Sequence, residues 1–171
     1  VYELFLPGRA KVVPAALEAL SPETRKAAEA DLAATNARTT FVVPPILLQK
    51  MMQWERKFVK AGGLLAAGVD PWGNGSLPGY GDHRNYELLV EAGFSPAEAI
   101  KIMTANGAQV LGELDQYGTV TAGKRADLVV LDGNPVARPA DIGKVRWVFK
   151  DGIGYDSAKL VGSVKGMVGI Q

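Results

Sequence analysis

Residues 118–155 read GTVTAGKRADLVVLDGNPVARPADIGKVRWVFKDGIGY, and this stretch organises the second part of the chain. It contains three short runs rich in β-branched residues, at 119–120, 126–131 and 145–150, each followed by a glycine-containing turn. Short apolar runs bounded by Gly, Asp, Asn and Pro are typical of strands joined by tight turns. We therefore predict a small β unit over residues 116–171.

Upstream of this unit, the pattern changes to helices alternating with buried strands. Residues 39–43 (TTFVV) and 64–69 (LLAAGV) are near-continuous runs, as expected for parallel strands covered on both faces. Between them, residues 47–61 carry apolar side chains at helical spacing and end at a Gly-Gly pair. Strand, helix and strand together form one crossover unit of an α/β fold.

Two further helices are predicted from their first residues. Ser21 and Ser95 are each followed by proline, which gives a serine N-cap and a proline at the first helical position. Glu98, three residues after Ser95, completes a capping box. We predict helices over residues 22–35 and 96–111.

Three phrases resemble the amidohydrolase superfamily, in its imidazolonepropionase and prolidase-like branch: LLAAGVDP, DHRN and GKRADLVVLDG. The resemblance implies an α/β fold in which residues 1–115 are the C-terminal portion of a (β/α)8 TIM-like barrel. Residues 116–171 would then supply part of a small composite β-sandwich domain. Residues 39–43 and 64–69 become the seventh and eighth barrel strands.

Asp70 directly follows the second of these strands, at the end where barrel enzymes place their catalytic groups. From spacing alone, an Asp before Pro-Trp-Gly-Asn-Gly favours an ordinary turn residue. The resemblance reverses this interpretation, because it implies that Asp70 binds the catalytic metal and accepts a proton during hydrolysis of amide-like C–N bonds. The implied substrate is a small molecule.

The metal centre cannot be completed from this sequence. A hydrolytic zinc site usually needs at least three protein ligands, and the chain has one histidine and no cysteine. A (β/α)8 barrel also needs about 250 residues, more than are present. We therefore expect a divalent metal, zinc, whose other ligands lie on a missing N-terminal part of the same protein, and we expect this chain alone to be inactive.

Three residues near Asp70 are candidates for the substrate mouth. Trp72 and Tyr80 lie in a glycine-rich loop that either shapes the mouth or is simply a long turn. His83 is a candidate substrate-side residue, although a lone histidine at the start of a helix is more often structural. Asn85 stands where related sequences often carry glutamate. By contrast, the charged residues of the β unit are predicted to be turn and edge residues: Lys124, Asp127 and Asp132.

Composition excludes several other classes. A net charge of +1 gives no extended field for a nucleic acid or an anionic membrane, and no apolar run approaches the roughly 20 residues that span a bilayer. The chain lacks a P-loop or dinucleotide fingerprint. We expect a cytoplasmic protein that can form a homo-oligomer, and no disulfides because cysteine is absent.

Two other functions stay open at this point. The chain can be a non-catalytic folded module that lacks a complete metal site, which its single histidine favours. Alternatively, it can keep the superfamily's fold and belong to an enzyme that isomerises a sugar acid or catalyses a decarboxylation. Tight zinc binding by the isolated chain would contradict the module, and activity of the intact protein on amide substrates would exclude the last alternative.

Overall fold

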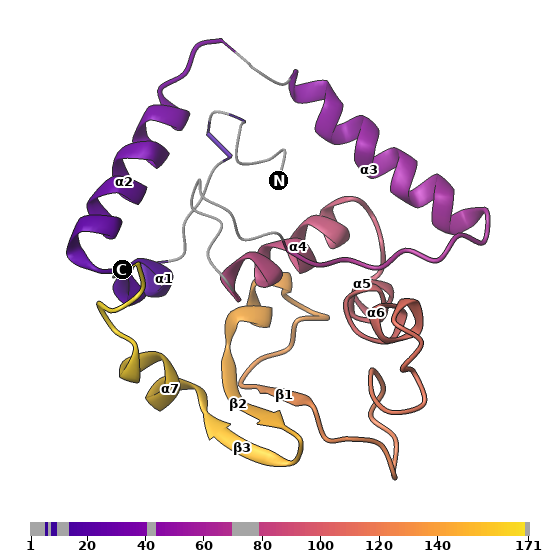
Figure 1. The fold of residues 1–171 in the computed structure, drawn as a ribbon. Coiled ribbons are helices and arrows are strands. Elements are labelled where there is room, and N and C mark those ends of the chain that lie inside the picture. The colour runs from indigo at the N-terminus through magenta and orange to yellow at the C-terminus, as the bar shows by residue number, and fades with distance from the viewer. Residues whose placement is uncertain (1–5, 7, 10–13, 41–43, 70–78, 170–171) are drawn as a thin grey trace.

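The computed structural model of this chain describes residues 6, 8–9, 14–40, 44–69 and 79–169 (Figure 1). The helices are α1 (Pro14–Ala19), α2 (Pro22–Asn36), α3 (Pro45–Lys60), α4 (Tyr80–Glu91), α5 (Pro96–Met103), α6 (Ala105–Val110) and α7 (Ser157–Ser163), with a 3₁₀ turn η2 (Pro139–Gly143). The strands are β1 (Leu128–Leu131), β2 (Val145–Lys150) and β3 (Ile153–Asp156). Among these described residues, no helix is long and apolar enough to cross a membrane.

The two helix starts predicted from serine caps, at Pro22 and Pro96, are confirmed. The Ser21 side chain accepts a hydrogen bond from the backbone N–H of Thr24 at 3.2 Å and so caps α2. In α5, Ser95 and Glu98 form the reciprocal bonds of a capping box. Helix α3 ends one residue before the predicted limit, and Gly62 follows it at φ +90°. Such caps are read from a few neighbouring residues, which is why they could be predicted.

The single helix predicted over 96–111 is wrong, because the structure divides it at Thr104 into α5 and α6. Thr104 has φ −126° and ψ −84°, and its hydroxyl donates to the carbonyl of Ile100 at 2.7 Å. A threonine side chain that bonds to the carbonyl four residues earlier competes with the helical backbone. The interruption turns α6 so that Asn106 and Ala108 are buried.

The predicted strand at 64–69 is not a strand in the structure. Its side chains do alternate as in a strand, with Leu65 and Ala67 packed against the core and Leu64 exposed. The described part of the chain, however, supplies no neighbouring strand to pair with it. Of the strand predicted at 39–43, Thr39 and Thr40 form a bend, and residues 41–43 lie outside the described residues.

The small β unit is an antiparallel sheet in the order β1-β2-β3. Strands β1 and β2 confirm two predicted runs, whereas 119–120 is a loop and β3 was not predicted. Asp151 and Gly152 connect β2 to β3 with φ values of 52° and 78°. Positive φ at both central residues is the requirement of the type I′ hairpin turn, which Asp-Gly sequences favour.

The main core lies between α4 and α5 (Figure 1). It consists of five buried residues: Tyr86, Leu89, Phe94, Ala99 and Ile102. Helix α4 also packs against η2, which places the first turns of α4 beside the β unit. The core therefore joins the helical part of the chain to the sheet.

The C-terminal segment returns to the first helices, as the C label beside α1 shows in Figure 1. Val168 donates its backbone N–H to the Ala19 carbonyl at 2.9 Å and accepts one from Ser21 at 2.9 Å. Lys165 and Glu18 form an ion pair at 3.0 Å. These contacts attach the residues after α7 to the corner between α1 and α2.

Candidate functional site

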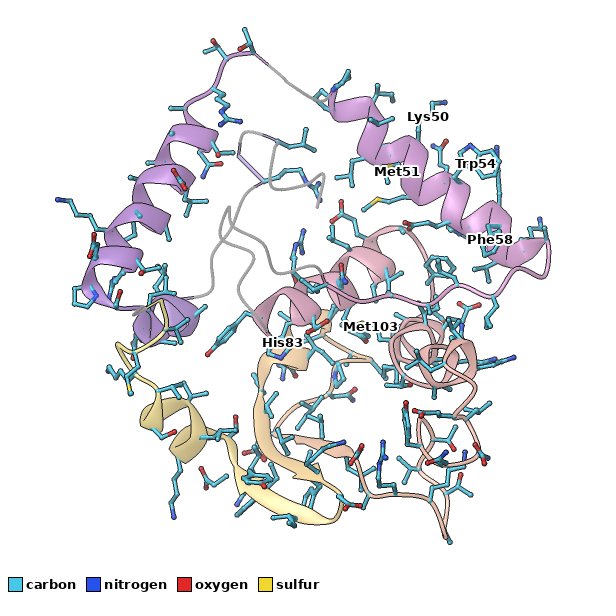
Figure 2. The ribbon with its side chains drawn as sticks, viewed as in Figure 1. Lys50, Met51, Trp54, Phe58, His83 and Met103 are labelled. Atoms are coloured by element: carbon cyan, nitrogen blue, oxygen red, sulfur yellow. The ribbon has the colours of Figure 1, made fainter. Side chains whose placement is uncertain are left out.

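The first turn of α4 brings together two of the residues predicted for the substrate mouth. The rings of Tyr80 and His83 meet edge to face, with centroids 6.0 Å apart and planes at 81°. His83 faces Gly143 of η2, since a Cβ atom on that glycine would lie 3.6 Å from His83 Nδ1. Figure 2 shows His83 at the end of α4 that adjoins the β unit. The pair therefore lies where the helical and β parts meet.

His83 is half-buried, and this determines its charge. Burial lowers the pKa of His83 below its ordinary value of 6.5, although the nearby carboxylates of Asp82 and Glu87 act in the opposite direction. An imidazole with a lowered pKa is neutral at physiological pH, so it can both donate and accept a hydrogen bond. That state suits contact with a polar substrate better than attraction of an anion.

Residues 65–68 are held by hydrogen bonds with three helices rather than by a neighbouring strand. Asn106 Nδ2 donates to the Leu65 carbonyl at 2.6 Å, and Asn85 Nδ2 donates to the Gly68 carbonyl at 2.9 Å. The Ala67 N–H reaches the Ile102 carbonyl at 3.4 Å. Helices α4, α5 and α6 therefore all hold residues 65–68.

Asn85 and Asn106 were not predicted to have this role. Their signal in the sequence is weak, because an asparagine inside a helix does not reveal which backbone group its amide will reach. Asn106 is 8% exposed, and its Oδ1 atom has no described hydrogen-bond partner. Only the donor side of this amide is therefore used within the described residues.

Asp70 and Trp72, the other predicted site residues, lie outside the described residues. Within the residues that are described, no group of three or more His, Cys, Asp or Glu side chains could hold a metal ion. Tyr80 and His83 together supply one imidazole and one phenol, which is not the ligand set of a hydrolytic centre. The described residues therefore do not fit a complete metal site.

The most buried carboxylate of the β unit, Asp141, was missed in the sequence. It accepts hydrogen bonds from the Asn134 N–H at 3.0 Å and from the Arg138 guanidinium, and it pairs with Lys144 at 2.9 Å. These contacts, the backbone bond first, hold the pKa of Asp141 well below its usual range. Every one of these partners lies within seven residues of Asp141 in the sequence, so the carboxylate stabilises a local turn. Its charge is balanced by Arg138 and Lys144, and we assign it no catalytic role.

Asp127 agrees with its predicted place at the edge of the sheet. Its carboxylate accepts from Lys150 Nζ at 2.7 Å, from the Asp151 N–H at 2.7 Å and from Arg125 Nε at 3.0 Å. The lysine and the backbone N–H lower the pKa of Asp127 from 3.8 to about 2. The other two residues also serve local structure, since Lys124 donates to the Leu114 carbonyl and Asp132 pairs with Arg146.

Two curated relatives are each similar to about half of the chain. Adenine deaminase 2 of Jannaschia sp. is 33% identical over 102 residues, which are 53% of this chain and 15% of that protein. Imidazolonepropionase of Deinococcus radiodurans is 37% identical over 79 residues, which are 46% of this chain and 19% of that protein. The chain therefore matches less than a fifth of the length of either relative.

A solved structure is also similar to this chain. A Xaa-Pro dipeptidase with methionine bound in its active site superposes with a TM-score of 0.56 at 25% identity, over 77% of this chain and 33% of that chain. The family model described as "Amidohydrolase family" matches residues 56–158, more than half of the chain. The matched residues include residues 64–69, helices α4, α5 and α6, and the three strands of the sheet. The chain belongs to the amidohydrolase family.

Proposed function

We propose that this chain is the C-terminal part of a hydrolase that cleaves amide-like C–N bonds in a small molecule. The observation that carries the proposal is the family match over residues 56–158. A deaminase and a dipeptidase, the activities named for two of the similar proteins, both break C–N bonds. Sugar-acid isomerisation and decarboxylation find no such support among them.

Asp70 is the proposed catalytic residue. The proposal is supported by the hydrogen bond from Asn85 to the Gly68 carbonyl, which holds the backbone two residues before Asp70 in the sequence. A carboxylate positioned there can take a proton from an attacking water and return it to the departing nitrogen, which neutralises a poor leaving group. Tyr80, His83 and Trp72 are proposed to line the substrate mouth, with neutral His83 as a hydrogen-bonding group.

The family generally uses a divalent metal, which when bound polarises a carbonyl and acidifies water. We propose zinc in this protein. Because the described residues offer no group of three ligands, the remaining ligands are assigned to residues outside this chain, on an N-terminal part of the same protein. The absence of three ligands among the described residues also favours the alternative, a non-catalytic module. The two hypotheses differ in their predictions, because the module predicts no hydrolytic activity in any longer protein that contains this chain.

Exposed apolar side chains on the sheet support the proposal that a further part of the protein covers it. Val129 and Val130 point to opposite faces of β1 and are 59% and 43% exposed, and Trp147 on β2 is 36% exposed. A sheet with apolar side chains on both faces normally packs against another layer on each side. We propose that additional strands cover it and complete a composite β sandwich.

Replacement of Asp70 by Asn tests the proposed function. In the intact enzyme, Asp70→Asn should lower kcat by about 10²- to 10⁴-fold, because an amide cannot accept the proton. Hydrolysis of proline dipeptides and simple cyclic amides is the assay, and circular dichroism checks that the variant folds. Asp132→Asn, at an exposed ion pair, is the matched control and should keep normal turnover. Near-normal turnover of Asp70→Asn would remove Asp70 from the mechanism.

A further inference from the structure

A cleft of about 570 Å³ lies between α3 and the turn that joins α4 to α5, and neither Tyr80 nor His83 lines it. Its walls include Arg56, Lys57, Val59 and Lys60 of α3, faced by Phe94 and Glu98. Clefts of roughly 300 to 1,000 Å³ are the size that small ligands occupy in proteins. Nothing in the proposed hydrolysis uses this cleft.

The lining of the cleft carries an excess of positive charge. Arg56, Lys57 and Lys60 are cationic. Hydrogen bonds from Ser95 and, to a smaller extent, the charge of Arg56 lower the pKa of Glu98. Glu98 is the one acidic lining residue, and its carboxylate already accepts hydrogen bonds from Ser95 N at 2.8 Å and Ser95 Oγ at 2.7 Å. Three cationic side chains and one carboxylate therefore line the cleft, which gives the lining a net charge of +2.

The Arg56 guanidinium lies beside the backbone at Gly93. A Cβ atom on Gly93 would lie 2.4 Å from Arg56 Nη1, so the guanidinium occupies the space next to this glycine. Gly93 also has φ +96°, a conformation that favours glycine. On the same side, buried Phe94 and half-buried Val59 add apolar surface next to the cations.

We propose that this cleft binds a small organic anion. An oxyanion group, either carboxylate or phosphate, would be held by Arg56, Lys57 and Lys60, while an apolar body would lie against Val59 and Phe94. A planar guanidinium suits oxygen anions of both kinds, because its N–H groups can reach two oxygens at once. The proposal is independent of the hydrolytic function, since none of these residues belongs to that site.

Titration of the full 171-residue chain with three probes tests the proposal: phenyl phosphate, benzoate and inorganic phosphate, at ionic strength held constant with NaCl. Amide resonances of Gly93 and Phe94 should shift saturably with phenyl phosphate, and inorganic phosphate should bind more weakly because it lacks the apolar body. Comparison of benzoate with phenyl phosphate tells which oxyanion is preferred. Shifts that do not saturate, or that occur equally along α2, would overturn the proposal.

Variants of the lining give the sharper test. Arg56→Ala should weaken phenyl phosphate binding by about five- to tenfold, the usual loss for a charge-assisted hydrogen bond at an accessible site. Glu98→Gln should strengthen it by about two- to threefold, because glutamine still fits the capping box while one negative charge is removed. Lys26→Ala, on exposed α2, is the matched control and should bind as the unmodified chain does. Equal affinity in all three variants would contradict the assignment.

Discussion

At the scale of single residues, Tyr86 links the two parts of the molecule. Its side chain is fully buried in the core, and its hydroxyl donates to the Pro135 carbonyl in the β unit at 3.0 Å. Tyr86→Phe should lower the free energy of unfolding by about 1 kcal/mol, since one hydrogen bond is lost. Tyr86→Ala should lower it by about 3–5 kcal/mol, because it also opens a cavity. Urea denaturation measures both, and equal losses would show that the ring contributes little packing.

The carboxylate of Asp127 should make stability depend on pH under acidic conditions. Its pKa is about 2 in the folded chain, against an ordinary value of 3.8. The unfolded chain therefore binds more protons between about pH 4 and pH 2, so stability should fall as the pH decreases through this window. Unfolding measured at several pH values should show a smaller slope in Asp127→Asn. An unchanged slope would mean that Asp127 does not contribute to this loss.

Single residues also show what a sequence can predict about a site. Asp127 and Asp132 were predicted to be edge and turn residues, and Gly133, Asn134 and Pro135 directly follow Asp132 as they do in a turn. Asp141 was missed, since its burial depends on how Arg138 and Lys144 fold back over it. The contact of Tyr80 with His83 follows from their helical spacing, whereas the approach of Gly143 depends on tertiary packing.

At the scale of elements, the two asparagine bonds to residues 65–68 should be measurable. Asn106→Ala should destabilise the chain by about 1–3 kcal/mol, because the carbonyl of half-buried Leu65 loses its donor. Asn85→Ala should cost less, about 0.5–1.5 kcal/mol, since this bond is more exposed. Chemical denaturation with amide exchange at Ala67 provides the measurement, and Gln49→Ala on exposed α3 is the control. If Asn106→Ala lowers stability no more than Gln49→Ala does, the Asn106 hydrogen bond does not hold residues 65–68.

Elements with local signals were predicted well, and elements with distant partners were not. Helices α2 and α5 begin at the residues where their caps predicted them. The 64–69 run has the alternation and composition of a strand, yet a strand needs a neighbour, and the described residues provide none. Instead, side-chain amides occupy two of its carbonyl groups.

At the scale of the whole molecule, the described residues include no group of three or more His, Cys, Asp or Glu side chains that could hold a metal ion. After dialysis against zinc and removal of free metal, the isolated chain should retain well below one zinc ion per molecule, because a lone carboxylate or imidazole binds zinc weakly. Elemental analysis is the measurement. Stoichiometric zinc that survives chelation would show that the chain assembles a site by itself.

The central claim is that Asp70 serves a metal-dependent hydrolase whose other ligands lie outside this chain. The most direct test is the metal content of a protein in which the chain is joined to the proposed N-terminal part, measured beside the isolated chain and the joined Asp70→Asn variant. We predict at least one divalent ion per joined protein, a clear reduction in Asp70→Asn and none in the isolated chain. A joined protein without metal, or one whose metal content is unaffected by Asp70→Asn, would contradict the account.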